Sequence, residues 1–430
     1  MSEAVDHDNV DYDTVDFFRD DKLIGDPYPY FDYLRDKCPV QVEPNHNVVM
    51  VTGYDEACEI YGDPDTFSSC LSVSGPFPGF PVPLVGDDVS DLIEKHRDEL
   101  PMSDQLPTMD PPKHRDHRGL LMRLLTPARL RENEAAMASL ADRQIDAFIQ
   151  SGSCELISDF ANPFTFFIIA NLLGVPEEDQ AEIHEGFKGR KGTVGSTSKA
   201  MGHSPLEYLY DLLSTYVEDR RSNPRADVMT GMAQATFEDG TLPEVIDVVR
   251  VAANLFAAGQ ETTVRLLGTS FQLIAERPDL QDLLRSDPAA IPNFVEECLR
   301  YESPVKGDFR LARVNTKVGG VDIPAGTIVM VVNGGANHDA RKFSSPKEFQ
   351  PDRSNARQHL AFGRGIHTCP GGPLARAEGR VALERILART DDITISEAHH
   401  GPPSARRYDY VPTYILRGLR ELHLEFTPRV

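Results

Sequence analysis

The sequence predicts a mainly α-helical fold with small β-sheets at one side. Across residues 113–297, apolar side chains recur at helical spacing and only short Gly- and Pro-containing stretches interrupt them. Residues 243–276 form the longest such stretch, which at about 1.5 Å per residue makes a helix on the order of 50 Å long. Short runs of alternating apolar residues return at 318–332 and indicate strands.

The other elements follow in chain order. Residues 27–64 predict a helix, then alternating apolar residues of strand type, and then another short helix, so the first third is mixed α and β. Residues 71–108 are rich in Pro and Gly and too long for an ordinary connection, so we expect a functional lid or a disordered segment. A Gly- and Ser-rich stretch at 189–205 interrupts the helical part, and a last helix begins just after Cys369.

The domain organisation is predicted to be simple. A chain of 430 residues is long enough for two domains, but nothing in its middle has the composition of a linker. We expect a flexible acidic N-terminus at residues 1–17 and one large domain at 18–430. The hydrophobic fraction of 40% is enough for a core of that size.

Composition also bears on location and partners. The first thirty residues have no basic start and no apolar run, and no later stretch has the length of a membrane span, so we expect a cytoplasmic protein without a membrane anchor. The net charge of −23, without any Lys- and Arg-rich run, disfavours nucleic acid as a partner.

The cysteines are few and scattered. No CxxC pair occurs, which argues against a disulfide framework and against a zinc knuckle. We expect most of them to be reduced, buried and inert, so a special one must be found from its neighbours. The six are Cys38, Cys58, Cys70, Cys154, Cys298 and Cys369.

Cys369 has distinctive neighbours. It lies in a glycine-punctuated loop directly before an amphipathic helix, and a helix N-terminus lowers the pKa of a thiol. Gly363, Gly365 and Gly371 let the backbone turn tightly and approach a flat ligand. From the residues alone, a structural cysteine remains the commoner alternative, and a zinc site using His367 and Cys369 is a weaker one.

The segment FGRGIHTCPGGPLAR resembles the cysteine-loop signature of the cytochrome P450 family. The resemblance implies a single large haem-thiolate monooxygenase fold in which Cys369 binds the iron of haem b (iron protoporphyrin IX) on the proximal side. It also implies that other loop residues surround the cofactor. The matching residues are Phe362, Gly363, Gly365, His367, Cys369, Gly371, Leu374, Ala375 and Arg376.

The long predicted helix contains AAGQETT. A glycine inside a helix costs about 1 kcal/mol relative to alanine, so Gly259 needs a compensating reason. By the same resemblance, Ala258 and Gly259 lie over the distal face of the haem and leave room for dioxygen. Glu261 and Thr262 then relay the two protons that oxygen activation requires.

Two further groups of residues follow from the resemblance. Glu297 and Arg300 in VEECLRYESPV, with Arg353 in FQPDR, are expected to form a buried charged network that holds the cysteine loop. The carboxylates of haem need cationic or hydrogen-bonding partners. Four residues occupy the family's positions for these contacts: His114, Arg118, Arg310 and His367.

The resemblance implies insertion of one oxygen atom from O2 into a small or medium apolar organic substrate. No flavin or iron–sulfur motif occurs on the chain, so electrons should come from NAD(P)H through a ferredoxin and its reductase. A peroxide-using enzyme and a haem sensor or carrier are the alternatives, and Glu261 with Thr262 argues against both. Substrate contacts are expected from residues 77–84, the stretch 189–205, Asn254, Ala258, Val305–Phe309 and Val411–Thr413.

A chain of this charge must still bind its electron donor. Because bacterial ferredoxins are usually acidic, docking requires a locally positive face. By resemblance, that face is the proximal side of the haem. The candidate cations are Lys113, Arg115, Arg118, Arg123, Arg129, Arg364 and Arg376.

Overall fold

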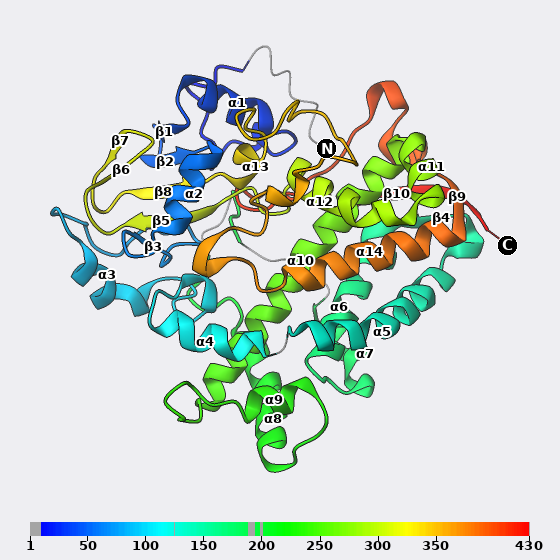
Figure 1. Ribbon diagram of the computed structural model, residues 1–430, viewed down its shortest axis with the longest axis horizontal. Coiled ribbons are helices and arrows are strands. Elements are labelled where there is room, and N and C mark those ends of the chain that lie inside the picture. Colours follow the sequence, from blue (N-terminus) through cyan, green and yellow to red (C-terminus); the bar gives the residue numbers. More distant parts are fainter. Residues whose placement is uncertain (1–9, 124, 188–193, 198–200, 430) are drawn as a thin grey trace.

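The helix α10, Val245–Glu276, runs through the middle of the molecule and organises the rest (Figure 1). The structure is a computed structural model that describes residues 10–123, 125–187, 194–197 and 201–429. α10 contacts α6 (Asn162–Leu172), α8 (Tyr210–Ser222) and α14 (Gly372–Arg389). The long helix predicted at residues 243–276 is confirmed.

The remaining helices surround α10 or lie beside the sheets. Figure 1 shows α5 beneath α14, with α8 and α9 together at the bottom of the view. Their bounds are α1 Tyr28–Lys37, α2 Tyr54–Gly62, α3 Ser90–His96, α4 Lys113–Met122, α5 Pro127–Asp146, α7 Glu177–Phe187, α9 Val228–Ala233, α11 Pro278–Ser286, α12 Ile291–Tyr301, α13 Asn333–Ala336 and α15 Glu397–His400.

Two groups of strands lie on opposite sides of the helices (Figure 1). On one side, a five-stranded sheet has the order β1-β2-β8-β5-β3, with β2 and β8 parallel and the other neighbours antiparallel. Its strands are β1 Val40–Glu43, β2 Val48–Val51, β8 Ile328–Val331, β5 Asp308–Ala312 and β3 Phe67–Ser68. The hairpin of β6 Thr316–Val318 and β7 Val321–Ile323 lies beside it.

On the other side, β4 Ser153–Glu155 and β9 Thr390–Ile395 flank β10 His423–Pro428 in an antiparallel sheet. The strand β4 was not predicted, because we expected only helices between residues 113 and 297. Its three residues carry no strand pattern, and β4 is defined by its pairing with the distant β10.

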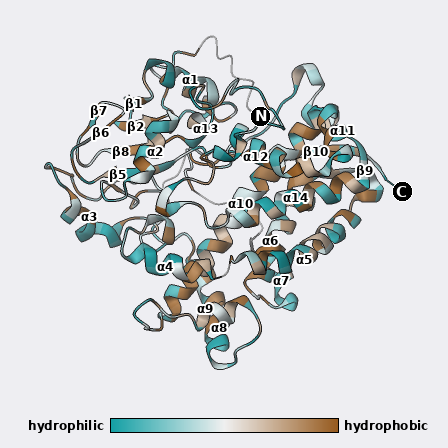
Figure 2. Ribbon diagram, viewed as in Figure 1, coloured by the Kyte–Doolittle hydropathy of each residue, from teal (hydrophilic) through white to brown (hydrophobic). Residues whose placement is uncertain are grey.

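The largest core lies between the helices. Phe160, Phe166, Phe256 and Phe271 are fully buried in it, and apolar stretches are visible along α10 and α14 in Figure 2. A mainly α fold with small sheets is therefore confirmed. None of the helices in the described ranges is both long and apolar enough to cross a membrane.

Two segments are more ordered than the sequence predicted. Within 71–108, Val89 and Ile93 are fully buried and anchor the short helix α3 against Leu311 of β5, so this region is neither disordered nor a free lid. Within the expected flexible N-terminus, Phe17 is buried and its ring stacks on Tyr30 with centroids 5.6 Å apart. Aromatic packing thus holds residues 10–17, whereas residues 1–9 lie outside the described part.

Candidate functional site

Cys369 lies where the loop after residue 360 turns into α14. Its backbone N–H donates to the Phe362 carbonyl at 2.8 Å, which closes the loop on itself. Gly365 adopts φ +73°, and a Cβ there would lie 2.2 Å from the Tyr61 carbonyl oxygen. The turn therefore requires glycine for two independent reasons, a left-handed backbone and a close approach to α2.

The surroundings of the sulfur do not by themselves produce a thiolate. Burial raises the pKa of the Cys369 thiol, and hydrogen bonds from the Gly371 and Gly372 backbone together with the Arg118 charge oppose this only in part. The helix N-terminus thus acts in the predicted direction, but burial outweighs it. A thiol in such a place ionises when a metal cation binds it.

Four cationic or imidazole side chains gather beside this loop. The ring centroids of His114 on α4 and His367 lie 4.0 Å apart, and Arg118 donates to the Thr368 carbonyl at 2.6 Å. Arg310 on β5 is buried and donates to the Phe309 carbonyl at 2.7 Å. The structure therefore brings together all four residues predicted to bind the haem carboxylates.

This group is suited to an anion. Burial and neighbouring positive charge, chiefly from Arg118 and Arg310 respectively, lower the pKa of His114 to about 4 and that of His367 to about 2. The Nε2 atoms of both rings are buried, and neither has a hydrogen-bond partner among the described residues. Buried polar atoms normally have partners, so carboxylates reaching this place would satisfy them.

On α10, the predicted acid and alcohol lie in consecutive positions. The Thr262 hydroxyl donates to the Ala258 carbonyl at 2.8 Å, one helical turn earlier. Glu261 is about one third exposed and forms an ion pair with Arg265, one turn later on the same helix. Because the hydroxyl hydrogen is committed to Ala258, the Thr262 oxygen is free to act as an acceptor.

The packing of α10 against α6 gives one structural reason for Gly259. A Cβ at this position would lie 2.8 Å from Cδ1 of Ile169 on α6. Ile169 packs against the space left by the missing side chain, and the expectation that Gly259 leaves room for dioxygen stays a prediction. Its cost within the helix is offset by closer packing of α10 against α6.

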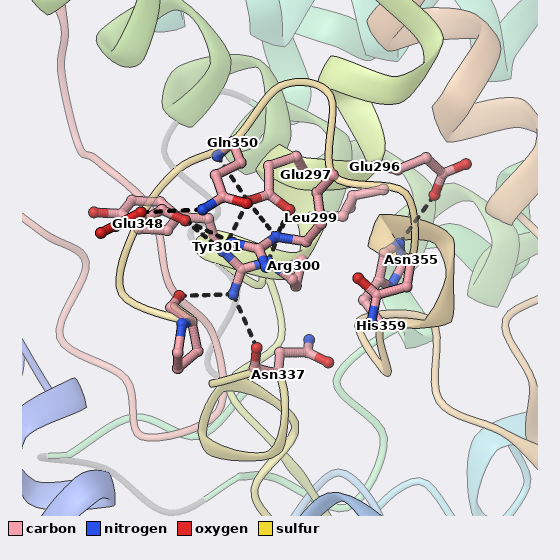
Figure 3. A network of polar contacts seen from close by, with 12 residues as sticks. Glu296, Glu297, Leu299, Arg300, Tyr301, Asn337, Glu348, Gln350, Asn355 and His359 are labelled. Atoms are coloured by element: carbon pink, nitrogen blue, oxygen red, sulfur yellow. Dashed lines mark hydrogen bonds and ion pairs between the residues drawn. The ribbon is translucent and has the colours of Figure 1, made fainter. Parts of the chain in front are cut away.

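The predicted charged network is present and buried, and Figure 3 shows Glu297 and Arg300 within it. Both carboxylate oxygens of Glu297 accept from Arg300 at 2.8 Å, and Arg353 Nε lies 3.0 Å from each of them. Arg300 also donates to the carbonyls of Asn337, Pro346 and Glu348. The prediction that these three charges meet is confirmed, but their remaining bonds go to residues 337–350 and not to the cysteine loop.

Comparison with known proteins establishes the family. A sequence model described as Cytochrome P450 matches residues 195–397. Cytochrome P450 144 of Mycobacterium tuberculosis is 30% identical to this chain, over 99% of this chain and 95% of that protein. The chain belongs to the cytochrome P450 family.

This P450 is similar to other characterised members. The 6-deoxyerythronolide B hydroxylase of Saccharopolyspora erythraea is 31% identical over 87% of this chain and 91% of that protein. The substrate-free structure of CYP150A6 from Mycobacterium marinum is 54% identical, with a TM-score of 0.92 over 97% of this chain and all of the other. The predicted family, fold and monooxygenase class are confirmed, and the family implies a haem cofactor.

Two buried acids near the site were missed by sequence reasoning. Glu296 precedes Glu297 on α12 and is 3% exposed, whereas Glu378 on α14 is 1% exposed and lies beside Thr263 of α10. Burial raises the pKa of Glu378 to about 8. Both residues belong to stretches that had drawn attention for other reasons, but an acid on a helix is ordinarily exposed, and nothing local marks these two as buried.

The regions expected to contact substrate are only partly comparable with the structure. Asn254 and Thr413 are buried, and Ser196 of the Gly- and Ser-rich stretch forms a bridge with Thr413. Residues 188–193 and 198–200 of that stretch lie outside the described residues. Phe77 and Phe309 both pack against Phe18, so these two rings belong to the N-terminal aromatic cluster.

Proposed function

We propose that this P450 inserts one oxygen atom from O2 into a small or medium apolar organic substrate, with electrons from NAD(P)H delivered by a ferredoxin and its reductase. The observation that carries the proposal is that an acid, Glu261, and an alcohol, Thr262, occupy consecutive positions on α10, in a chain that also has the cysteine loop. The names of its relatives support hydroxylation, since 6-deoxyerythronolide B hydroxylase is one of them.

The residues fit a haem on the grounds of their own chemistry. Cys369 offers one sulfur ligand, and Phe362 and Gly371 belong to the same loop. His114, Arg118, Arg310 and His367 would bind the two carboxylates, which supplies the missing partners of the buried Nε2 atoms. When bound, haem supplies the iron that reduces and activates dioxygen, with thiolate ligation favouring cleavage of the O–O bond.

The two residues on α10 would move protons. Thr262, whose hydrogen is held by the Ala258 carbonyl, presents its oxygen as an acceptor to water or to an oxygen species in the pocket. Glu261 is partly exposed and paired with Arg265, so it can exchange protons with solvent while the arginine limits its movement. Together they provide a route by which protons enter from the surface.

The donor would dock on the face formed by the start of α4 and the cysteine loop. Lys113, Arg115 and Arg123 are exposed there, and Met122 and Ile366 are large apolar side chains about 40% exposed beside them. A mixture of cations and exposed apolar residues suits an acidic protein partner.

Not all of the predicted docking cations are equally available. Arg376 is engaged by the buried Glu296, and Arg118 is directed to the Thr368 carbonyl. Arg115 pairs with Glu238, but both of these side chains are about 70% exposed, so this arginine stays accessible to a partner. We therefore assign the docking role chiefly to Lys113, Arg115 and Arg123.

The test is turnover by the purified holoenzyme. A panel of apolar compounds is first screened for a low-spin to high-spin change of the haem spectrum, and those that bind are incubated with NADH, a ferredoxin and its reductase. We expect a product heavier by one oxygen atom, with the label from 18O2. Product formed equally well from hydrogen peroxide without donors would favour the peroxide-using alternative, and absence of any product from bound compounds would favour a sensor or carrier.

A further inference from the structure

Glu296 stands at the centre of a second charged network, separate from that of Glu297. Its side chain is 4% exposed and accepts from Arg376 at 2.7 and 3.0 Å. It also lies 3.0 Å from His359 Nε2 and 3.0 Å from Arg357 Nε. One buried carboxylate is thus shared by three side chains, of which only Arg357 is largely exposed.

The partners of Glu296 come from both ends of the cysteine loop. His359 lies ten residues before Cys369, and Arg376 lies seven residues after it on α14. Figure 3 shows Glu296 and His359 together, to one side of the Arg300 network. A single carboxylate on α12 therefore connects the segment that leads into the cysteine loop with the helix α14 that follows it.

Phe362 connects this network to the cysteine. The Arg376 guanidinium carbon lies 4.6 Å from the centroid of the Phe362 ring, and the His359 ring centroid lies 5.6 Å from it. His359 Nδ1 accepts from the Ala361 N–H at 3.1 Å, so the ring is held from both nitrogens. The Phe362 carbonyl in turn accepts from the Cys369 N–H. A shift of Arg376 or His359 would therefore move Phe362, and through its carbonyl the backbone of Cys369.

The carboxylate is held in its charged form. Burial disfavours ionisation of Glu296, but hydrogen bonds from His359 and Arg376 outweigh it and lower the pKa to about 2. The carboxylate is therefore ionised at neutral pH, so these charge-assisted hydrogen bonds are present there. Hydrogen bonds to a charged group are stronger and more directional than neutral ones, which suits a positioning role.

We infer that Glu296 is a positioning residue for the haem ligand: by holding His359 and Arg376 on either side of Phe362, it fixes the loop that presents Cys369 to the iron. The inference rests on the proposed role of Cys369 as that ligand. The side-chain partners of Glu296 are Arg357, His359 and Arg376, so it acts through the geometry of the loop and not by contact with the sulfur.

The experiment compares Glu296→Gln and Arg376→Gln in the haem-loaded full chain. Each substitution removes one partner of the Glu296–Arg376 ion pair, so each should loosen the cysteine loop. The readout is the rate at which the reduced carbon monoxide adduct loses its thiolate-type absorption in a fixed concentration of urea. We expect both variants to lose it about tenfold faster than wild type, as loss of a buried charge-assisted hydrogen bond implies. Hydrogen exchange of the amides at 360–369 should rise in both.

The two substitutions separate positioning from a simple effect of charge. They change the local charge in opposite directions, so an electrostatic effect alone would move the haem reduction potential, and the rate of ligand loss, in opposite directions. Positioning predicts acceleration in both. Glu134→Gln is the matched control. Glu134 lies on α5 and pairs at 2.9 Å with Arg380 of α14, the helix that also carries Arg376, and its substitution should leave the rate unchanged.

Three results would overturn the inference: opposite effects of the two substitutions, rates equal to wild type, or an equal acceleration by Glu134→Gln. If Glu296→Gln does not fold, Glu296→Asp takes its place. It keeps the charge but shortens the reach of the carboxylate, so positioning predicts an intermediate rate, whereas an effect of charge alone predicts the wild-type rate. Failure of the underlying assignment looks different, because either wild type would show no thiolate-type absorption or Cys369→Ala would keep it.

Discussion

Glu378 makes the stability of this P450 depend on pH in an unusual direction. Its carboxyl group is buried on α14, and neither oxygen has a well-formed hydrogen bond to any described residue. Burial raises its pKa from about 4.5 to about 8, with the neighbouring Thr263 hydroxyl opposing this only in part. At neutral pH the group is therefore protonated in the folded protein and ionised in the unfolded chain.

The sign of the effect follows from proton binding. Between pH 4.5 and pH 8 the folded state binds more protons at this site than the unfolded state, so the free energy of unfolding falls as pH rises. The stability associated with the raised pKa is fully present below pH 4.5 and is lost by about pH 8. At about 1.36 kcal/mol per pH unit, this loss amounts to about 3 kcal/mol between pH 5.5 and pH 8.

The variant Glu378→Gln removes the titrating group and keeps its shape. We expect its free energy of unfolding relative to wild type to rise by about 3 kcal/mol from pH 5.5 to pH 8, because only the wild-type value falls as the Glu378 proton becomes less favourable to bind. Urea unfolding of the holoenzyme, followed by circular dichroism at several pH values, measures this difference. Glu134→Gln, which neutralises a partly exposed acid on α5, supplies the background from a change of one unit in net charge.

A difference between Glu378→Gln and wild type that stays constant over this pH range would refute the reasoning. It would mean that Glu378 is ionised in the folded protein or that another group compensates its charge. The absolute offset between the two proteins does not bear on the argument, since a glutamine amide leaves its own hydrogen-bonding groups to be satisfied.

Three further predictions concern the reaction itself. Cys369→Ala should abolish the thiolate-type absorption of the reduced carbon monoxide adduct, and its persistence in that variant would assign the ligand to another cysteine. Thr262→Ala should keep haem and substrate binding but lower the product formed per NADH by about tenfold or more, with hydrogen peroxide appearing instead; unchanged coupling would exclude Thr262 from the relay. Arg115→Glu or Arg123→Glu should slow association with ferredoxin and leave substrate affinity intact, and added salt should slow wild type in the same way. Rates insensitive to both salt and these substitutions would move the docking face elsewhere.

The fold could be predicted where the signal was long and local. The 32 residues of α10 repeat the helical apolar pattern many times, so its existence and length followed from the sequence alone. By contrast, β4 has only three residues, and its strand conformation depends on pairing with β10. The helix α3 was missed for a related reason, because the neighbouring Pro and Gly residues dominate the composition of 71–108 and conceal the buried Val89 and Ile93.

The site could be predicted where residues belong to recognisable motifs. The resemblance led to the Glu297, Arg300 and Arg353 network and to the four side chains gathered beside the cysteine loop. It did not indicate which way each side chain faces. Gly259 turned out to face Ile169 of α6, and Glu296 faces the cysteine loop while its neighbour Glu297 faces the opposite network. Such distinctions depend on the packing of three or more elements, and no single segment contains them.

The pairing of β4 with β10 also has a consequence for how the chain is made. During synthesis β4 leaves the ribosome long before β10, so its backbone N–H and C=O groups have no partner strand while most of the protein is being translated. Contacts between such distant segments form slowly, and an unpaired strand edge can associate with other chains in the meantime. We therefore expect β4 to be open to such association until the last strand arrives, and expression yield to be more sensitive to changes in β10 than its size suggests.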